Sequence, residues 1–137
     1  MITRIKIDGF KSFQDFEMEF TPFTVIAGTN ASGKTNLFDA LQLLSALTEN
    51  DLKNAFSLQR GSASELFTKF DDGQTANIMS FEADMLVDKT VNDKFGGAAP
   101  LKYTRLKYTL KLERVISEFG NDDLRVIEES LEPFRHN

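Results

Sequence analysis

Residues 23–42 read FTVIAGTNASGKTNLFDALQ, and this stretch decides how the rest of the chain is interpreted. An apolar, β-branched run leads into small and polar residues, and these lead into leucines spaced three and four apart. The apolar run predicts a strand over 23–28 that is buried on both faces. The leucine spacing predicts an amphipathic helix over 34–49. A strand, a glycine-rich loop and a helix are therefore expected to follow one another directly.

The loop between this strand and helix matches the pattern G-x-x-x-x-G-K-[ST] in the context that the pattern requires. Its glycines tolerate unusual dihedral angles, so the backbone can curl with its N–H groups pointing inward. The following helix directs its first amide groups and the positive end of its dipole at the same place. The lysine provides a charge for the β and γ phosphates of ATP, and the neighbouring hydroxyl can ligate Mg²⁺. The alternative is an ordinary glycine turn that caps a helix. The residues expected to bind the nucleotide are Gly28, Thr29, Asn30, Ala31, Ser32, Gly33, Lys34 and Thr35, with Lys34 as the catalytic residue and Thr35 as the Mg²⁺ ligand.

The segment before the loop adds a second motif. Residues 2–20, ITRIKIDGFKSFQDFEMEF, place FKSF after an apolar alternation. Together with the loop, this segment resembles the N-terminal lobe of the RecF, SMC and OLD group of ABC-type ATPases, over residues 1 to about 48. The resemblance implies a P-loop NTPase that couples ATP hydrolysis to the closure of two heads.

The same resemblance implies roles for four further residues. Asn30 and Asn36 would order the phosphate loop, and Lys11 of FKSF would approach the phosphates from the first hairpin. The group also has a glutamine after the first helix that senses Mg²⁺, and Gln59 is the candidate here. The alternative for Lys11 is a solvated lysine in a turn, and the alternative for Gln59 is a polar residue on the surface.

The second half of the chain reads as β structure. A hairpin is expected over 2–10 and 15–20, and further strands over 76–87, 102–116 and 123–131. We expect an α/β fold: the N-terminal lobe of an ABC-type ATPase head, with one P-loop helix and a largely antiparallel meander. Within 1–137 the expected parts are the hairpin, loop and helix over 1–50, a loop region over 51–75, and an antiparallel subdomain over 76–137.

Two parts of such an ATPase are not found in the sequence. An apolar strand ending in Asp-Glu is replaced by LRVIEE at 124–129, which reads as a half-exposed strand with carboxylates facing water. An LSGG-like signature is also absent. The domain is therefore expected to be incomplete, as a fragment of a longer ATPase or one half of a split one.

Composition limits the other possibilities. The chain has 137 residues, no cysteine and a net charge of −5, which disfavour disulfides, zinc-thiolate sites and strong non-specific binding to nucleic acid. No window has the roughly 20 apolar residues that span a bilayer, so a cytoplasmic protein without membrane contact is expected.

The expected function is that of an ATP-binding fragment of a RecF/SMC/OLD-type ATPase in DNA repair, chromosome maintenance or phage defence. Its expected partners are the missing C-terminal half, a second head in a homodimer, and DNA in the full assembly. The alternative is a non-catalytic nucleotide-binding or interaction module that regulates assembly. A GTPase or small-molecule kinase is disfavoured because no NKxD motif is present.

Overall fold

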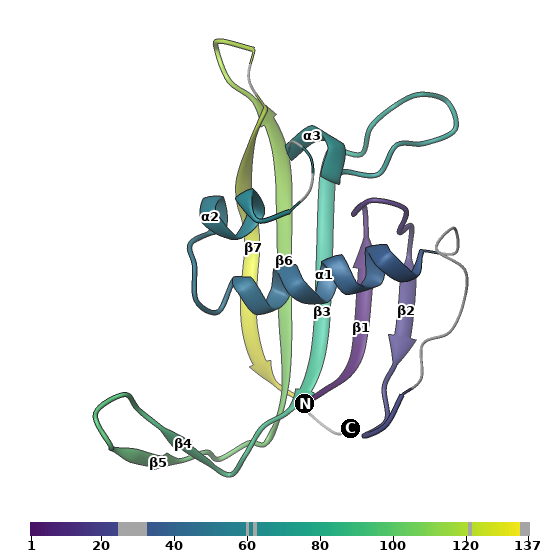
Figure 1. Ribbon diagram of the computed structural model, residues 1–137. Helices are drawn as coiled ribbons and strands as arrows, with labels where there is room; N and C mark the ends of the chain where they lie inside the picture. Colours follow the sequence, from purple (N-terminus) through teal and green to yellow (C-terminus); the bar gives the residue numbers. More distant parts are fainter. Residues whose placement is uncertain (25–32, 60, 62, 121, 135–137) are drawn as a thin grey trace.

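The computed structural model describes residues 1–24, 33–59, 61, 63–120 and 122–134. Its main element is a five-stranded antiparallel sheet with the strand order β2-β1-β3-β6-β7. A two-stranded hairpin of β4 and β5 projects beyond one end of this sheet (Figure 1). The strands are β1 (Ile2–Asp8), β2 (Phe16–Glu19), β3 (Ile78–Leu86), β4 (Thr90–Asn92), β5 (Ala98–Pro100), β6 (Arg105–Ile116) and β7 (Asp122–Pro133).

The helices of the described residues lie on one face of the sheet. The longest, α1 (Lys34–Ala46), runs across the strands, and α2 (Leu52–Ser57) and α3 (Ala63–Leu66) follow it (Figure 1). Alternation along the strands makes this face apolar, because neighbours in register point to the same side. Ile7 pairs with Phe81, which pairs in turn with Leu110, and these three side chains are buried. The core lies between this row and the helices.

The hairpin and the three predicted strands are confirmed. Both arms of the hairpin pair in antiparallel register, from Arg4 with Glu19 to Ile7 with Phe16. The meander continues through β3, β6 and β7 as expected. The sequence did not predict that β1 would pair with β3, which joins the hairpin and the meander into one sheet.

The helix predicted over 34–49 begins at Lys34 but ends at Ala46. The reason is local, because polar side chains bond to the last carbonyl groups. The Thr48 hydroxyl donates to Ser45 O (2.7 Å) and Asn50 Nδ2 donates to Ala46 O (3.1 Å). The leucine spacing predicted an apolar stripe of Leu37, Ala40, Leu41, Leu44 and Leu47 and missed Leu43, which is fully buried. Leu43 shares its cluster with residues of α2, a helix that the sequence reading did not predict.

The start of the strand predicted over 23–28 is wrong. Phe23 is 83% exposed and neither it nor Thr24 is in a strand. Thr21 and Thr24 close a local turn instead, in which the Thr21 N–H donates to Thr24 Oγ1 (3.0 Å). Hydroxyl side chains stabilise turns in this way. Residues 25–28 lie outside the described residues.

Candidate nucleotide-binding site

The amino end of α1 carries no cap from its own side chains. Gly33 occupies the cap position with φ 86° and ψ 4°. This is a left-handed conformation that glycine adopts without strain. Glycine has no side chain that could cap the first amide groups, and the first turn of α1 contains no acidic residue. Neither the cap residue nor the first turn of α1 therefore compensates the positive end of the helix dipole, which suits an anionic ligand.

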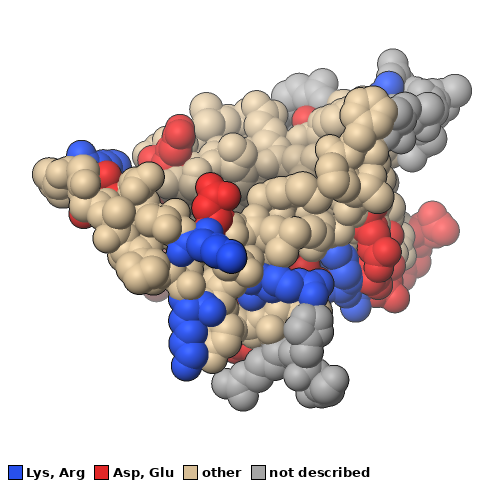
Figure 2. All heavy atoms as spheres, turned by 90° about the horizontal axis from the view of Figure 1, so that it is seen from below, with Lys and Arg blue, Asp and Glu red and all other residues tan. Residues whose placement is uncertain are grey.

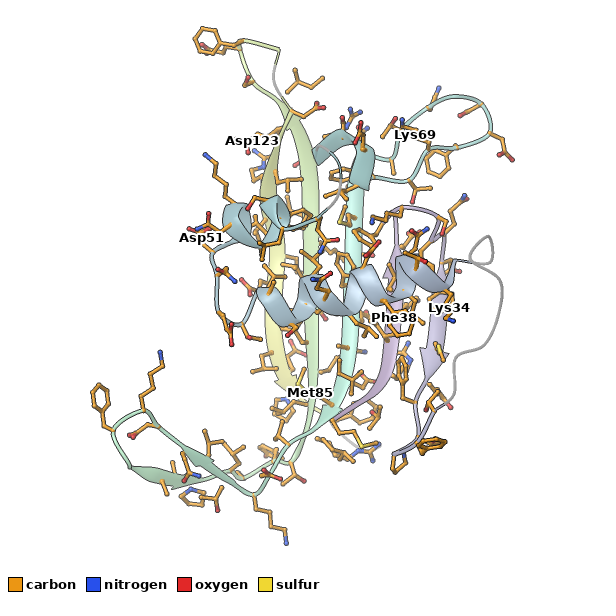
Figure 3. All side chains as sticks on the ribbon, in the orientation of Figure 1. Lys34, Phe38, Asp51, Lys69, Met85 and Asp123 are labelled. Atoms are coloured by element: carbon orange, nitrogen blue, oxygen red, sulfur yellow. The ribbon has the colours of Figure 1, made fainter. Side chains whose placement is uncertain are left out.

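Lys34 and Thr35 are the first two residues of this helix, and both are half-buried. Figure 3 shows Lys34 at the start of α1. Within the described residues, the Lys34 ammonium and the Thr35 hydroxyl have no hydrogen-bond or ion-pair partner, so both are available to a ligand. The other predicted residues of the loop, Gly28, Thr29, Asn30, Ala31 and Ser32, lie outside the described residues.

The turn between β1 and β2, residues 9–13 (GFKSF), is held in place by its backbone and by two buried rings. Gly9 has φ +78°, and a Cβ added there would lie 2.1 Å from Ile78 O. Only glycine fits such a position. Phe10 is fully buried and Phe13 is 7% exposed. The Lys11 N–H donates to Leu66 O (2.7 Å), which fixes the turn against the end of α3.

The two residues between these rings contact α1. Lys11 Nζ lies 2.6 Å from Asp39 Oδ2, and Asn36 Nδ2 donates to Ser12 Oγ (2.8 Å). A Cβ added to Gly33 would lie 3.6 Å from Ser12 Oγ, so the turn lies close to the cap residue as well. The structure therefore brings Lys11, Asn36 and the amino end of α1 together.

Sequence reasoning missed Asp39 and Ser12. The available signal for Asp39 was its charge. Apart from Lys34 at the helix start, it is the one charged residue of the 34–46 segment. For Ser12, the signal was its place between two phenylalanines that anchor a turn.

Gln59 is buried, with 8% of its surface exposed, and its backbone N–H donates to Phe56 O (3.1 Å). Its Nε2 is buried without a hydrogen-bond partner in the described part of the chain. A buried amide group without a partner is costly, so Gln59 is not an ordinary surface glutamine. Its role as a Mg²⁺ sensor stays a prediction.

The carboxylates of β7 are engaged in structural contacts. Glu128 pairs with Lys111 (3.2 Å), and Glu129 accepts a hydrogen bond from the Tyr108 hydroxyl (2.8 Å). Burial and the neighbouring Glu129 raise the pKa of Tyr108, which keeps the hydroxyl protonated as the donor. LRVIEE is a strand, as predicted, but it is more exposed than expected, because Val126 and Ile127 are 40% and 44% exposed.

The face of the sheet opposite the helices is covered by charges of both signs. Arg4 contacts Glu17, Asp84 (3.3 Å) and Glu82 (3.6 Å), and Lys107 also reaches Glu82 (3.8 Å). Figure 2, seen from one end of the sheet, shows a group of lysine and arginine side chains with carboxylates beside it. Such pairing reduces the net field of the face, so it is not a strongly basic surface.

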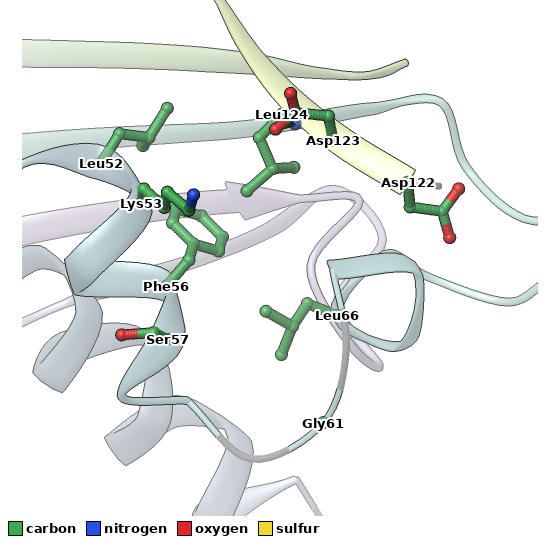
Figure 4. Close-up of a pocket in the computed structure, with 9 residues that line it drawn as sticks. All are labelled: Leu52, Lys53, Phe56, Ser57, Gly61, Leu66, Asp122, Asp123 and Leu124. Carbon is green, nitrogen blue, oxygen red and sulfur yellow. Dashed lines mark hydrogen bonds between the residues drawn. The ribbon is translucent and has the colours of Figure 1, made fainter. Parts of the chain in front are cut away.

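Two further features lie away from these residues. A pocket of about 350 Å³ opens between α2 and the start of β7 (Figure 4). Its lining includes Lys53, Phe56 and Asp123 but none of the predicted site residues. In the described part of the chain, no three acidic or histidine side chains gather into a metal site, and no helix is long and apolar enough to cross a membrane.

Comparison with known proteins agrees with this geometry. The family model described as an AAA ATPase domain matches residues 1–131. The chain belongs to this family. A solved structure from work on the ATP-driven dimerisation and DNA-stimulated activation of SMC ATPases has the same fold, with a TM-score of 0.55 and 19% sequence identity. The alignment covers 94% of this chain and 71% of that chain. No curated protein matches the chain.

These findings confirm the expected fold, that of the N-terminal lobe of an ATPase domain, which the chain shares with the SMC ATPase structure. In this AAA ATPase family protein, the sheet and α1 hold the GFKSF turn beside the helix start that follows the glycine loop. The family and the neighbouring fold support ATP binding by an ATPase domain.

Proposed function

We propose that this chain is the ATP-binding lobe of an ATPase in which two heads close on nucleotide. The observation that carries the proposal is the amino end of α1, which is uncapped and carries Lys34 and Thr35 without partners among the described residues. An uncompensated helix end, an ammonium group and a hydroxyl are the groups that a triphosphate with Mg²⁺ requires.

Each group has a separate task in this proposal. The α1 amide groups bind phosphate oxygens, and Lys34 places its charge beside the β and γ phosphates. The Thr35 hydroxyl is a ligand for Mg²⁺, and the bound ion neutralises charge on the phosphate oxygens. The chain's own contribution is positioning and electrostatic stabilisation.

Hydrolysis also needs a carboxylate that activates water. Glu128 and Glu129 of β7 already have partners in Lys111 and Tyr108. The proposal therefore assigns the catalytic glutamate and the signature residues to sequence outside this chain or to a partner. It includes a second head as partner, and DNA as a ligand of the complete assembly in DNA repair, chromosome maintenance or phage defence.

The test is a titration of the purified chain with a fluorescent ATP analogue, with Mg²⁺ and with EDTA. Lys34→Ala should lower the affinity at least about tenfold, because it removes a charge-assisted contact to phosphate. Thr35→Ala should reduce the gain in affinity that Mg²⁺ provides. Lys69→Ala, at an exposed position (Figure 3), is the control and should bind like the parent. Equal affinities for the parent and Lys34→Ala would refute the site.

An ATP hydrolysis assay separates the alternative function. Hydrolysis by the chain alone should be almost undetectable, and it should rise when the missing half or a second head is supplied. A chain that binds ATP but never gains turnover with these partners would instead be a non-catalytic module.

A further inference from the structure

The GFKSF turn presents one strained residue to α1. Lys11 has φ +49°. This left-handed conformation costs a residue with a side chain about 1–2 kcal/mol. The surrounding structure enforces it through the Lys11 N–H bond to Leu66 O and through the buried Phe10 ring. Strain that is held in this way points to a function for the side chain that it directs.

The direction of that side chain is set by α1. Lys11 Nζ lies 2.6 Å from Asp39 Oδ2, and each side chain is only 14% exposed. The ammonium also lies 5.5 Å from the centre of the Phe10 ring. This separation is within the range of a cation-π interaction. The ammonium of Lys11 is therefore engaged, whereas that of Lys34 is not engaged by any described residue.

Asp39 lies on the face of α1 that carries the proposed nucleotide ligands. It follows Thr35 by four residues and Asn36 by three. Residues at these spacings are neighbours on a helix surface. The ammonium of Lys11 is thus held about one helical turn from the proposed Mg²⁺ ligand. A long, flexible lysine stem can span such a distance without movement of the backbone.

We propose that Asp39 is a positioning residue that holds the Lys11 ammonium back from the phosphate site until the γ phosphate of a nucleoside triphosphate competes for it. This inference rests on the proposed nucleotide site. One ammonium cannot pair closely with both anions, so binding of the triphosphate breaks the Lys11–Asp39 pair. ADP lacks the γ phosphate and leaves the pair intact, so the pair adjusts the preference for ATP over ADP.

The test compares the ATP and ADP affinities of the parent chain and Asp39→Asn. Removal of the competing charge should tighten ATP binding about threefold to tenfold, the range expected for one partly exposed ion pair. ADP affinity should change less than about twofold. In a Lys11→Met background, where residue 11 keeps a side chain of similar length, the Asp39→Asn change should have no effect on either nucleotide.

A control variant and a second measurement distinguish the proposed role of Asp39 from a purely structural one. Asp39→Glu retains the charge and should restore ATP binding to near the parent value. Without nucleotide, Lys11 should react with an amine-acetylating reagent several-fold more slowly than the exposed Lys69, and Asp39→Asn should abolish this protection. Mass spectrometry of the digested chain gives both rates.

Three results would overturn the inference. One is equal weakening of ATP and ADP by Asp39→Asn, which indicates a purely structural role. Another is an Asp39→Asn effect that persists without Lys11. The third is the absence of ATP binding in the parent and in Asp39→Asn, which would refute the proposed nucleotide site as well. If ATP binds but Lys11 and Asp39 are not coupled, only the present inference is refuted.

Discussion

The turn that carries Lys11 depends on Gly9, and Gly9→Ala should be among the most damaging small substitutions in the chain. Gly9 has φ +78°, and a methyl group there would lie 2.1 Å from the carbonyl oxygen of Ile78, next to the start of β3. The left-handed conformation costs alanine about 1–2 kcal/mol. The overlap with backbone adds about 1–3 kcal/mol, because the neighbouring strand must move.

The expected total loss is about 2–5 kcal/mol, a large part of the roughly 5–15 kcal/mol that stabilises an ordinary domain. The assay is urea unfolding of the parent and the variant, followed by circular dichroism. At a slope of about 2 kcal/mol per molar urea, a loss of about 3 kcal/mol moves the midpoint by about 1.5 M.

Gly73→Ala is the matched control. Gly73 has a similar φ of +85°, but an added Cβ there meets no atom within 4 Å. It should therefore lose only the conformational part, about 1–2 kcal/mol. If both variants lost the same stability, the close contact between Gly9 and Ile78 would not be a feature of the folded protein and the argument would fail.

Two other predictions concern the core and the charged face. Leu43 is fully buried, whereas the Leu58 side chain is 60% exposed. Leu43→Ala should therefore cost about 2–5 kcal/mol and Leu58→Ala less than about 1 kcal/mol, and urea unfolding compares them. Hydrogen bonds from Arg4 lower the pKa of Glu17 below its ordinary value near 4.5. The pair therefore stabilises the fold above pH 4.5 and loses this effect as the pH falls through the lowered pKa, so the stability of the parent and Glu17→Gln should converge in acid.

The local elements could be predicted because their causes are local. The pairing of the first hairpin follows from alternation between Ile5 and Ile7 and their neighbours, and the start of α1 follows from the glycine before Lys34. The end of α1 was missed because the side chains of Thr48 and Asn50 donate hydrogen bonds to its last carbonyl groups, and the spacing of leucines contains no information about such bonds. Helix α2 was missed because its six residues are too few to show a period, although Asp51 caps it.

The sequence by itself determined the helix start at Lys34 and Thr35 and the family to which the chain belongs. Both depend on residue types at fixed spacing within short segments of the chain. Only the tertiary structure decided that β1 pairs with β3 and that Lys11 lies beside Asp39, 28 residues away. Such contacts arise when distant segments share one core, so burial and register across the sheet set them, and no local pattern contains that information.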